Sequence, residues 1–142
     1  MTIVLQIADS VTAQLNVASL SKSFVAERLY VPNFELEDMK ELRVSVVPRD
    51  VELGTLDREQ NRVHARIDVA VQKKFSTGNN SEIDPLVAFV EEIADLFRLK
   101  RLDSFNAARC VKVEHSVLYS TEHWEQLRQF TSLLTLTFEL AK

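Results

Sequence analysis

The longest regular alternation of apolar and polar residues runs from Arg62 to Phe75. Between Val63 and Val71 every second residue is apolar, and the residues that separate them include His64, Arg66 and Asp68. A period of two is typical of a strand with one buried face and one solvated face. Its length favours a central position, so the stretch predicts the middle strand of a sheet.

Shorter alternations predict four further strands, at residues 24–31, 42–47, 109–119 and 131–140. Pro32 and Pro48 are expected to end the first two, because proline donates no ladder hydrogen bond. In 109–119 the pattern places Val111 and Val113 on the face opposite Cys110. The charged residues from Arg49 to Asn61 predict a long hairpin connection, about 48–61, that projects from the sheet.

Two stretches have helical periodicity. In residues 3–15 an apolar residue recurs at every fourth position, and Leu86 to Phe97 form a second apolar stripe. Asp84 and Pro85 suit the N-cap and the first position of that second helix. Residues 36–40 could form one helical turn, and residues 120–129 a short helix or a wide loop.

Helices and strands do not alternate strictly, so a doubly wound parallel sheet is not expected. The order favours an α+β fold: an antiparallel or mixed sheet of four to five strands, with two main helices packed on one face. Residues 1–142 are expected to form a single domain, since this length suits one ordinary core.

The composition is that of a globular chain, with 46% hydrophobic and 27% charged residues. The formal charge of −4 argues against a sequence-independent grip on nucleic acid. There is no secretory signal and no apolar run of membrane-spanning length, so no membrane partner is expected and synthesis in the cytoplasm is the default. The two glycines are too far apart for a phosphate-binding loop.

Candidate chemistry is sparse. His64, His115 and His123 lack the close spacing of metal ligands, and Cys110 has no local signature of a nucleophile. We therefore expect no catalytic residues, no cofactor and no metal, and the chain is not expected to be an enzyme. The arginines Arg49, Arg58, Arg62 and Arg66 are candidate intersubunit contacts; a plain solvated face explains them equally well.

Four phrases carry a family resemblance: Leu42–Arg49, Arg66–Lys74, Leu86–Asp95 and Arg128–Phe138. Together with the order of elements, they resemble the tail terminator and head–tail joining (neck) proteins of tailed bacteriophages and prophages. The resemblance covers nearly the whole chain, and the family has no catalytic motif to check.

The resemblance implies a virion structural protein that forms a homohexameric ring, caps the tail tube and joins it to the head connector. The implied partners are further copies of the chain, the tail tube protein and the head-completion protein, with location in the tail or neck of the virion. DNA would pass through the lumen without specific binding, and six copies would carry −24 (6 × −4). The alternatives are a neck, head-closure or minor tail protein, and, in another class, a small enzyme or nucleic-acid-binding module.

Overall fold

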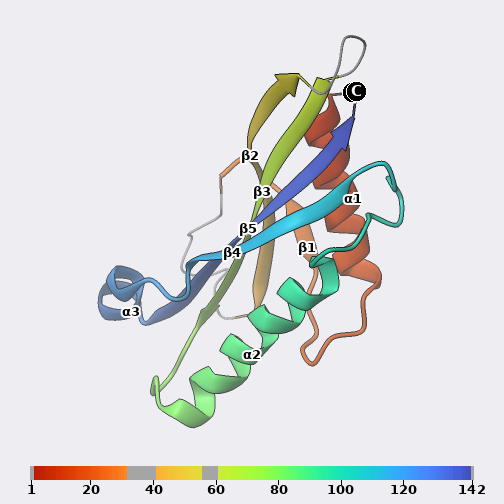
Figure 1. The fold of residues 1–142 in the computed structure, drawn as a ribbon. Coiled ribbons are helices and arrows are strands. Elements are labelled where there is room, and N and C mark those ends of the chain that lie inside the picture. Colours follow the sequence, from red (N-terminus) through yellow and green to blue (C-terminus); the bar gives the residue numbers. More distant parts are fainter. Residues whose placement is uncertain (1, 32–40, 56–60, 142) are drawn as a thin grey trace.

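The computed structural model describes residues 2–31, 41–55 and 61–141. Within them lie three helices and five strands, an α+β fold (Figure 1). In chain order they are α1 (Ile3–Val17), β1 (Ala26–Arg28), β2 (Arg43–Thr55), β3 (Asn61–Lys74), α2 (Asn80–Phe97), β4 (Arg109–Val117), α3 (Thr121–Leu127) and β5 (Gln129–Ala141). None of the described helices has the length and apolar character needed to cross a bilayer.

The five strands form one sheet in the order β1-β2-β3-β5-β4. The strand predicted from the alternation of residues 62–75 is β3, and its central position is confirmed. Neighbouring strands are antiparallel except β1, which runs parallel to β2, so the sheet is mixed. The long pairing of β3 with β2 and β5 makes these three strands the framework of the molecule.

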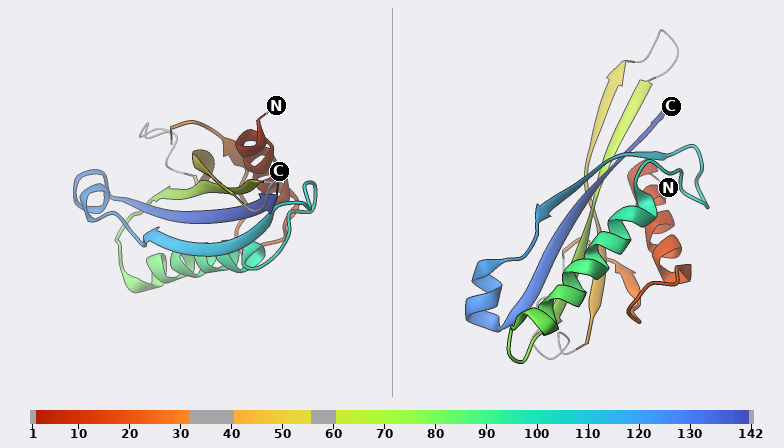
Figure 2. Two further views of the ribbon diagram at one scale, coloured as in Figure 1. Left: turned by 45° about the horizontal axis from the view of Figure 1, so that its top comes forward. Right: turned by 60° about the horizontal axis from the view of Figure 1, so that its bottom comes forward.

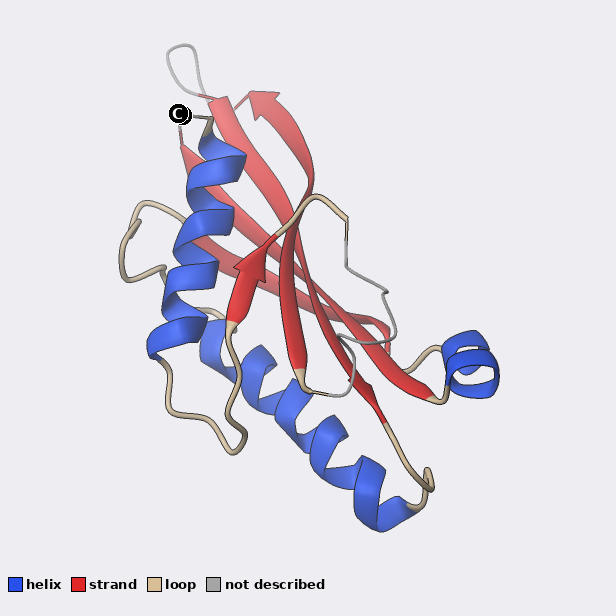
Figure 3. Ribbon diagram, turned by 180° about the vertical axis from the view of Figure 1, so that it is seen from behind, coloured by secondary structure: helices blue, strands red, loops and turns tan. Residues whose placement is uncertain are grey.

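Both main helices cover one face of this sheet (Figures 2 and 3). The apolar residues of β3 lie on that face, and Val69 stands between Val46 of β2 and Leu134 of β5. α1 contacts β1, β2 and β3, whereas α2 contacts β5 and β4. Ile7 and Phe89, one from each helix, are fully buried in the same apolar core. The opposite face carries the polar residues of β3 and is the surface of functional interest.

β2 does not end at Pro48, contrary to the sequence prediction. It continues to Thr55, with a register shift between Pro48 and Asp50. β1 pairs with β2 only up to Val46. Among the described strands, the side of β2 facing away from β3 is therefore already free at Pro48, where a missing N–H removes no ladder bond. The predicted 48–61 connection is thus mostly paired strand within the sheet, because β5 also pairs with this part of β3 as far as Arg62 (Figure 1). Its tip, 56–60, lies outside the described residues.

The first strand is shorter than predicted, because only Ala26–Arg28 of the 24–31 stretch pair with β2. Phe24 packs on the core instead, with its ring 5.2 Å from that of Phe89 in an edge-to-face contact. Tyr30 and Val31 are exposed. The helical turn predicted at 36–40 lies outside the described residues.

α2 begins at Asn80, five residues before Pro85, the residue that the sequence predicts at the first helical position. The N-cap is Asn79 rather than Asp84, and its side chain accepts a hydrogen bond from the Glu82 N–H. Glu82 in turn accepts backbone hydrogen bonds from Ser76, Thr77 and Gly78. Asn79 thus caps one N–H of the first turn, and the Glu82 carboxylate ties this turn to the preceding loop, whereas Pro85 lies inside the helix.

β4 departs from the predicted alternation through two register shifts, one between Cys110 and Lys112 and one between His115 and Val117. Cys110 is fully buried opposite Phe138, whereas Val111 is exposed. A bulge inserts an unpaired residue and resets which side chains face the core. The 120–129 stretch contains a short helix, α3, which ends at Arg128 in a left-handed conformation.

Candidate functional site

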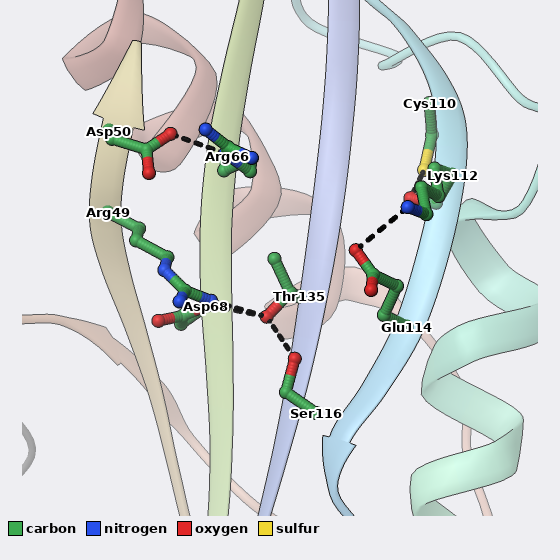
Figure 4. Close-up of polar contacts among 9 residues, drawn as sticks. All are labelled: Arg49, Asp50, Arg66, Asp68, Cys110, Lys112, Glu114, Ser116 and Thr135. Carbon is green, nitrogen blue, oxygen red and sulfur yellow. Dashed lines mark hydrogen bonds and ion pairs between the residues drawn. The ribbon is translucent and has the colours of Figure 1, made fainter.

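The polar face of the sheet carries a network of charged side chains from β2, β3, β5 and β4 (Figure 4). Arg66 of β3 donates from Nε to Oδ1 of Asp50 on β2 at 2.6 Å, and both side chains are about two-fifths exposed. The hydrogen bond to Asp50, followed by the charge of that carboxylate, raises the pKa of Arg66 above its ordinary value. Arg66 therefore keeps its charge and is held across two strands.

A second group lies one step along the strands, around the buried hydroxyl of Thr135 on β5 (Figure 4). This hydroxyl donates to Oδ1 of Asp68 at 2.8 Å and lies 2.7 Å from that of Ser116 on β4. Arg49 donates to Thr135 at 3.2 Å and lies 3.6 Å from the Asp68 carboxylate. The group therefore joins all four long strands.

A third group lies near the end of β5, around Glu139. His64 Nε2 lies 2.9 Å from Oε2 of this carboxylate, and Arg62 Nε lies 3.7 Å from Oε1. One carboxylate thus serves two basic residues of β3, and all three side chains are between about one-third and one-half exposed.

The structure places three of the four arginines that the sequence singled out. Arg49, Arg62 and Arg66 come together on one face, each beside a carboxylate of its own chain. Arg58 lies outside the described residues. Contact with a neighbouring copy stays a prediction for all four. The pairing partners could not be foreseen, because Glu139 lies more than seventy residues from His64 in the chain.

The histidines and the cysteine do not converge. His64 lies on the polar face, whereas Cys110 is buried on the face that the helices cover. Burial raises the pKa of the Cys110 thiol to about 11, which disfavours the thiolate. His123 belongs to α3, and its Nδ1 lies 2.8 Å from the hydroxyl of Thr131 on β5. Among the described residues, no three histidines, cysteines or carboxylates are placed to hold a metal ion.

A surface groove of about 850 Å³ lies between the α1–β1 connection and the start of β2. Its described lining includes Lys22, Glu27, Arg43 and Lys73, together with Phe24. None of its described lining residues is a histidine or a cysteine, so these residues do not assemble the candidate chemistry either.

One further surface, which the sequence pattern did not predict, lies where α2 passes into β4. Arg98, Leu99, Lys100 and Arg101 follow the helix directly and are all exposed. Arg101 forms an isolated bridge with Arg109, the first residue of β4, so the segment lies beside that strand. The run of cations was visible in the sequence. Its meeting with Arg109 depends on the fold.

Comparison with solved structures shows what this architecture resembles. The chain aligns over 100% of its length with a sheath/tube terminator of an extracellular contractile injection system, PVC, in its extended state. The TM-score is 0.51 and the sequence identity is 13%. The fold is terminator-like.

The likeness lies in the fold and not in detectable sequence similarity. No protein-family model matches the chain, and no curated protein matches it in sequence. The chain spans 57% of the length of the terminator, which therefore has a large part with no counterpart in these 142 residues.

Proposed function

We propose that this protein is a structural component of a tailed phage or a phage-like particle, in which it forms a ring that caps the tail tube. The observation that carries the proposal is the terminator-like fold, which extends over the whole chain. The ring is hexameric, ends polymerisation of the tube and offers the docking surface for the head connector. Its function is assembly, and no bond-making step is assigned to it.

The arrangement of charges supports this role. On the polar face the arginines lie within 4 Å of carboxylates from neighbouring strands, so the face is both charged and rigid. Such a face can meet a polar partner surface with little loss of side-chain freedom. The net charge of −4 per chain would repel DNA from the wall of a ring, which favours passage over binding.

The experiment is co-expression of the chain with the tube protein of the same particle, followed by electron microscopy of purified tubes. We expect one ring of this protein at one end of each tube and a tube length that stays finite. Tubes without a terminal ring, or with the protein distributed along their length, would refute the proposal. A ring that binds the connector but leaves tube growth unchecked would show a neck protein instead.

A further inference from the structure

Leu99, which follows the C-cap residue Arg98 of α2, departs from the residue preference of helix ends. Leu99 has φ 59°, the left-handed conformation that glycine or asparagine usually takes after a helix. Its side chain is 58% exposed, so the strain is not offset by burial within the subunit. A strained backbone that presents a large apolar side chain to solvent points to a contact outside the subunit.

The cations around Leu99 are also unmatched. Arg98, Lys100, Arg101 and Arg109 are exposed, and none forms an ion pair with a carboxylate in the part of the chain that the structure describes. The guanidinium of Arg101 donates a hydrogen bond to the carbonyl oxygen of Asn106. We call Arg98, Leu99, Lys100, Arg101 and Arg109 the basic edge.

The opposite edge of the sheet has the complementary chemistry. β1 covers β2 only as far as Val46, so the outer side of β2 beyond Pro48 is free among the described strands. There the chain alternates acidic and apolar residues, and Val51 and Leu53 are 44% and 64% exposed. We call Asp50, Val51, Glu52 and Leu53 the acidic edge.

The strand register places the two edges in one line. Glu52 pairs with His64, His64 with Glu139, Glu139 with Arg109, and Arg109 bridges to Arg101. This row crosses the whole sheet from an acidic residue to a basic one. In Figure 1 the far end of β2 and the α2–β4 connection lie on opposite sides of the central strands.

We propose that the acidic edge of one copy docks on the basic edge of the next copy in the ring. Val51 and Leu53 pack against Leu99, while Glu52 faces the cations that surround it. Because both edges lie on one row of the sheet, each copy meets the next with little axial displacement, and such head-to-tail contacts close into a ring when the rotation permits. This inference rests on the proposed function and names the surfaces that form its subunit contact.

A disulfide between copies tests the contact directly. The row from Glu52 to Arg101 spans four strand spacings, about 19 Å, which no disulfide bridges within one copy. We expect tube-bound Glu52→Cys/Arg101→Cys protein to give a ladder of covalent multimers under oxidation. Each single-cysteine variant is the matched control and should stay monomeric on a denaturing gel. The native Cys110 is buried and does not compete.

Substitutions test the chemistry of the same contact. Leu99→Gly should lower the yield of crosslinked multimers at least about tenfold, as expected for a central apolar anchor. It should leave the melting temperature equal or higher, because glycine accepts the positive φ. Val17→Ala, at an 81% exposed site on α1, is the control and should change neither. Glu52→Arg and Arg101→Glu should each weaken assembly, and their combination should restore it.

The outcomes separate the two proposals. Capped tubes without any Glu52–Arg101 crosslink would overturn this inference and leave the proposed function intact, with the tube or the connector as the occupant of the basic edge. Crosslinked ladders that Leu99→Gly leaves unchanged would refute the anchor. Tubes that wild-type protein fails to cap would overturn both.

Discussion

Gln72 in β3 allows a sharp test of how the polar side of the sheet is stabilised. Its side chain is 0% exposed, and neither Nε2 nor Oε1 has a hydrogen-bond partner among the described residues. A buried amide without partners loses its bonds to water and gains none in return, at a cost of roughly 1–3 kcal/mol in folding free energy.

Replacing Gln72 by methionine keeps the length and approximate volume of the side chain while removing both polar atoms. We therefore expect Gln72→Met to raise the free energy of unfolding by about 1–3 kcal/mol. For a chain of 142 residues, this corresponds to a melting temperature about 3–10 °C higher. Urea unfolding followed by circular dichroism, with calorimetry for the melting temperature, measures both quantities.

The same substitution at Gln14 in α1 is the matched control. Gln14 is 9% exposed, and its Oε1 accepts a hydrogen bond from the Asp103 N–H at 3.0 Å. Gln14→Met removes that bond and should lower stability by about 0.5–1.5 kcal/mol. If Gln72→Met also lowers stability, the amide of Gln72 is hydrogen-bonded in solution and the reasoning is wrong.

Three further predictions concern single side chains. Backbone hydrogen bonds from Gly78, Ser76 and Thr77 lower the pKa of Glu82 from 4.5 to about 2. Its contribution to stability is therefore present above pH 4.5 and lost as pH falls through about 2, so Glu82→Gln should flatten the acid side of the stability curve, measured by urea unfolding between about pH 5 and pH 2. Gly78→Ala should destabilise the fold by about 1–3 kcal/mol, because φ is +70° and a Cβ would lie 2.9 Å from Phe75. Gly54→Ala, where the nearest atom is 3.9 Å away, should have little effect, and equal losses at the two glycines in thermal melts would contradict this account. Cys110, buried and with a pKa of about 11, should resist iodoacetamide at pH 8 in the native protein and react in urea; rapid native labelling seen by mass spectrometry would show that the strand opens.

The local sequence pattern was sufficient to predict an element where one face of that element packs on the core. β3 was predicted to within one residue at each end, because its alternate residues from Val63 to Val71 are buried in the core that the helices cover. α1 was predicted for the same reason, with a continuous apolar stripe against the sheet. In both elements the periodicity directly reports burial.

Local pattern failed where a neighbouring element decides the outcome. Pro48 was predicted to end its strand, yet β2 continues because β1 stops short of it. The start of α2 was misplaced because Asn79 and Glu82 supply better caps than Asp84 and Pro85, through contacts with the preceding loop. In β4 two bulges shift the alternation, and nothing in the strand's own residues marks them.

By itself, the amino-acid sequence determined the period and polarity of each element: a sheet with one apolar face, helices to cover it, and arginines on the other side. Only the tertiary structure decided which strands adjoin, and so which charges meet. His64 and Glu139 lie 75 residues apart in the chain, and their contact follows from strand order and register. Burial of apolar surface acts locally and leaves a periodic signal, whereas charge pairing depends on which segments become neighbours.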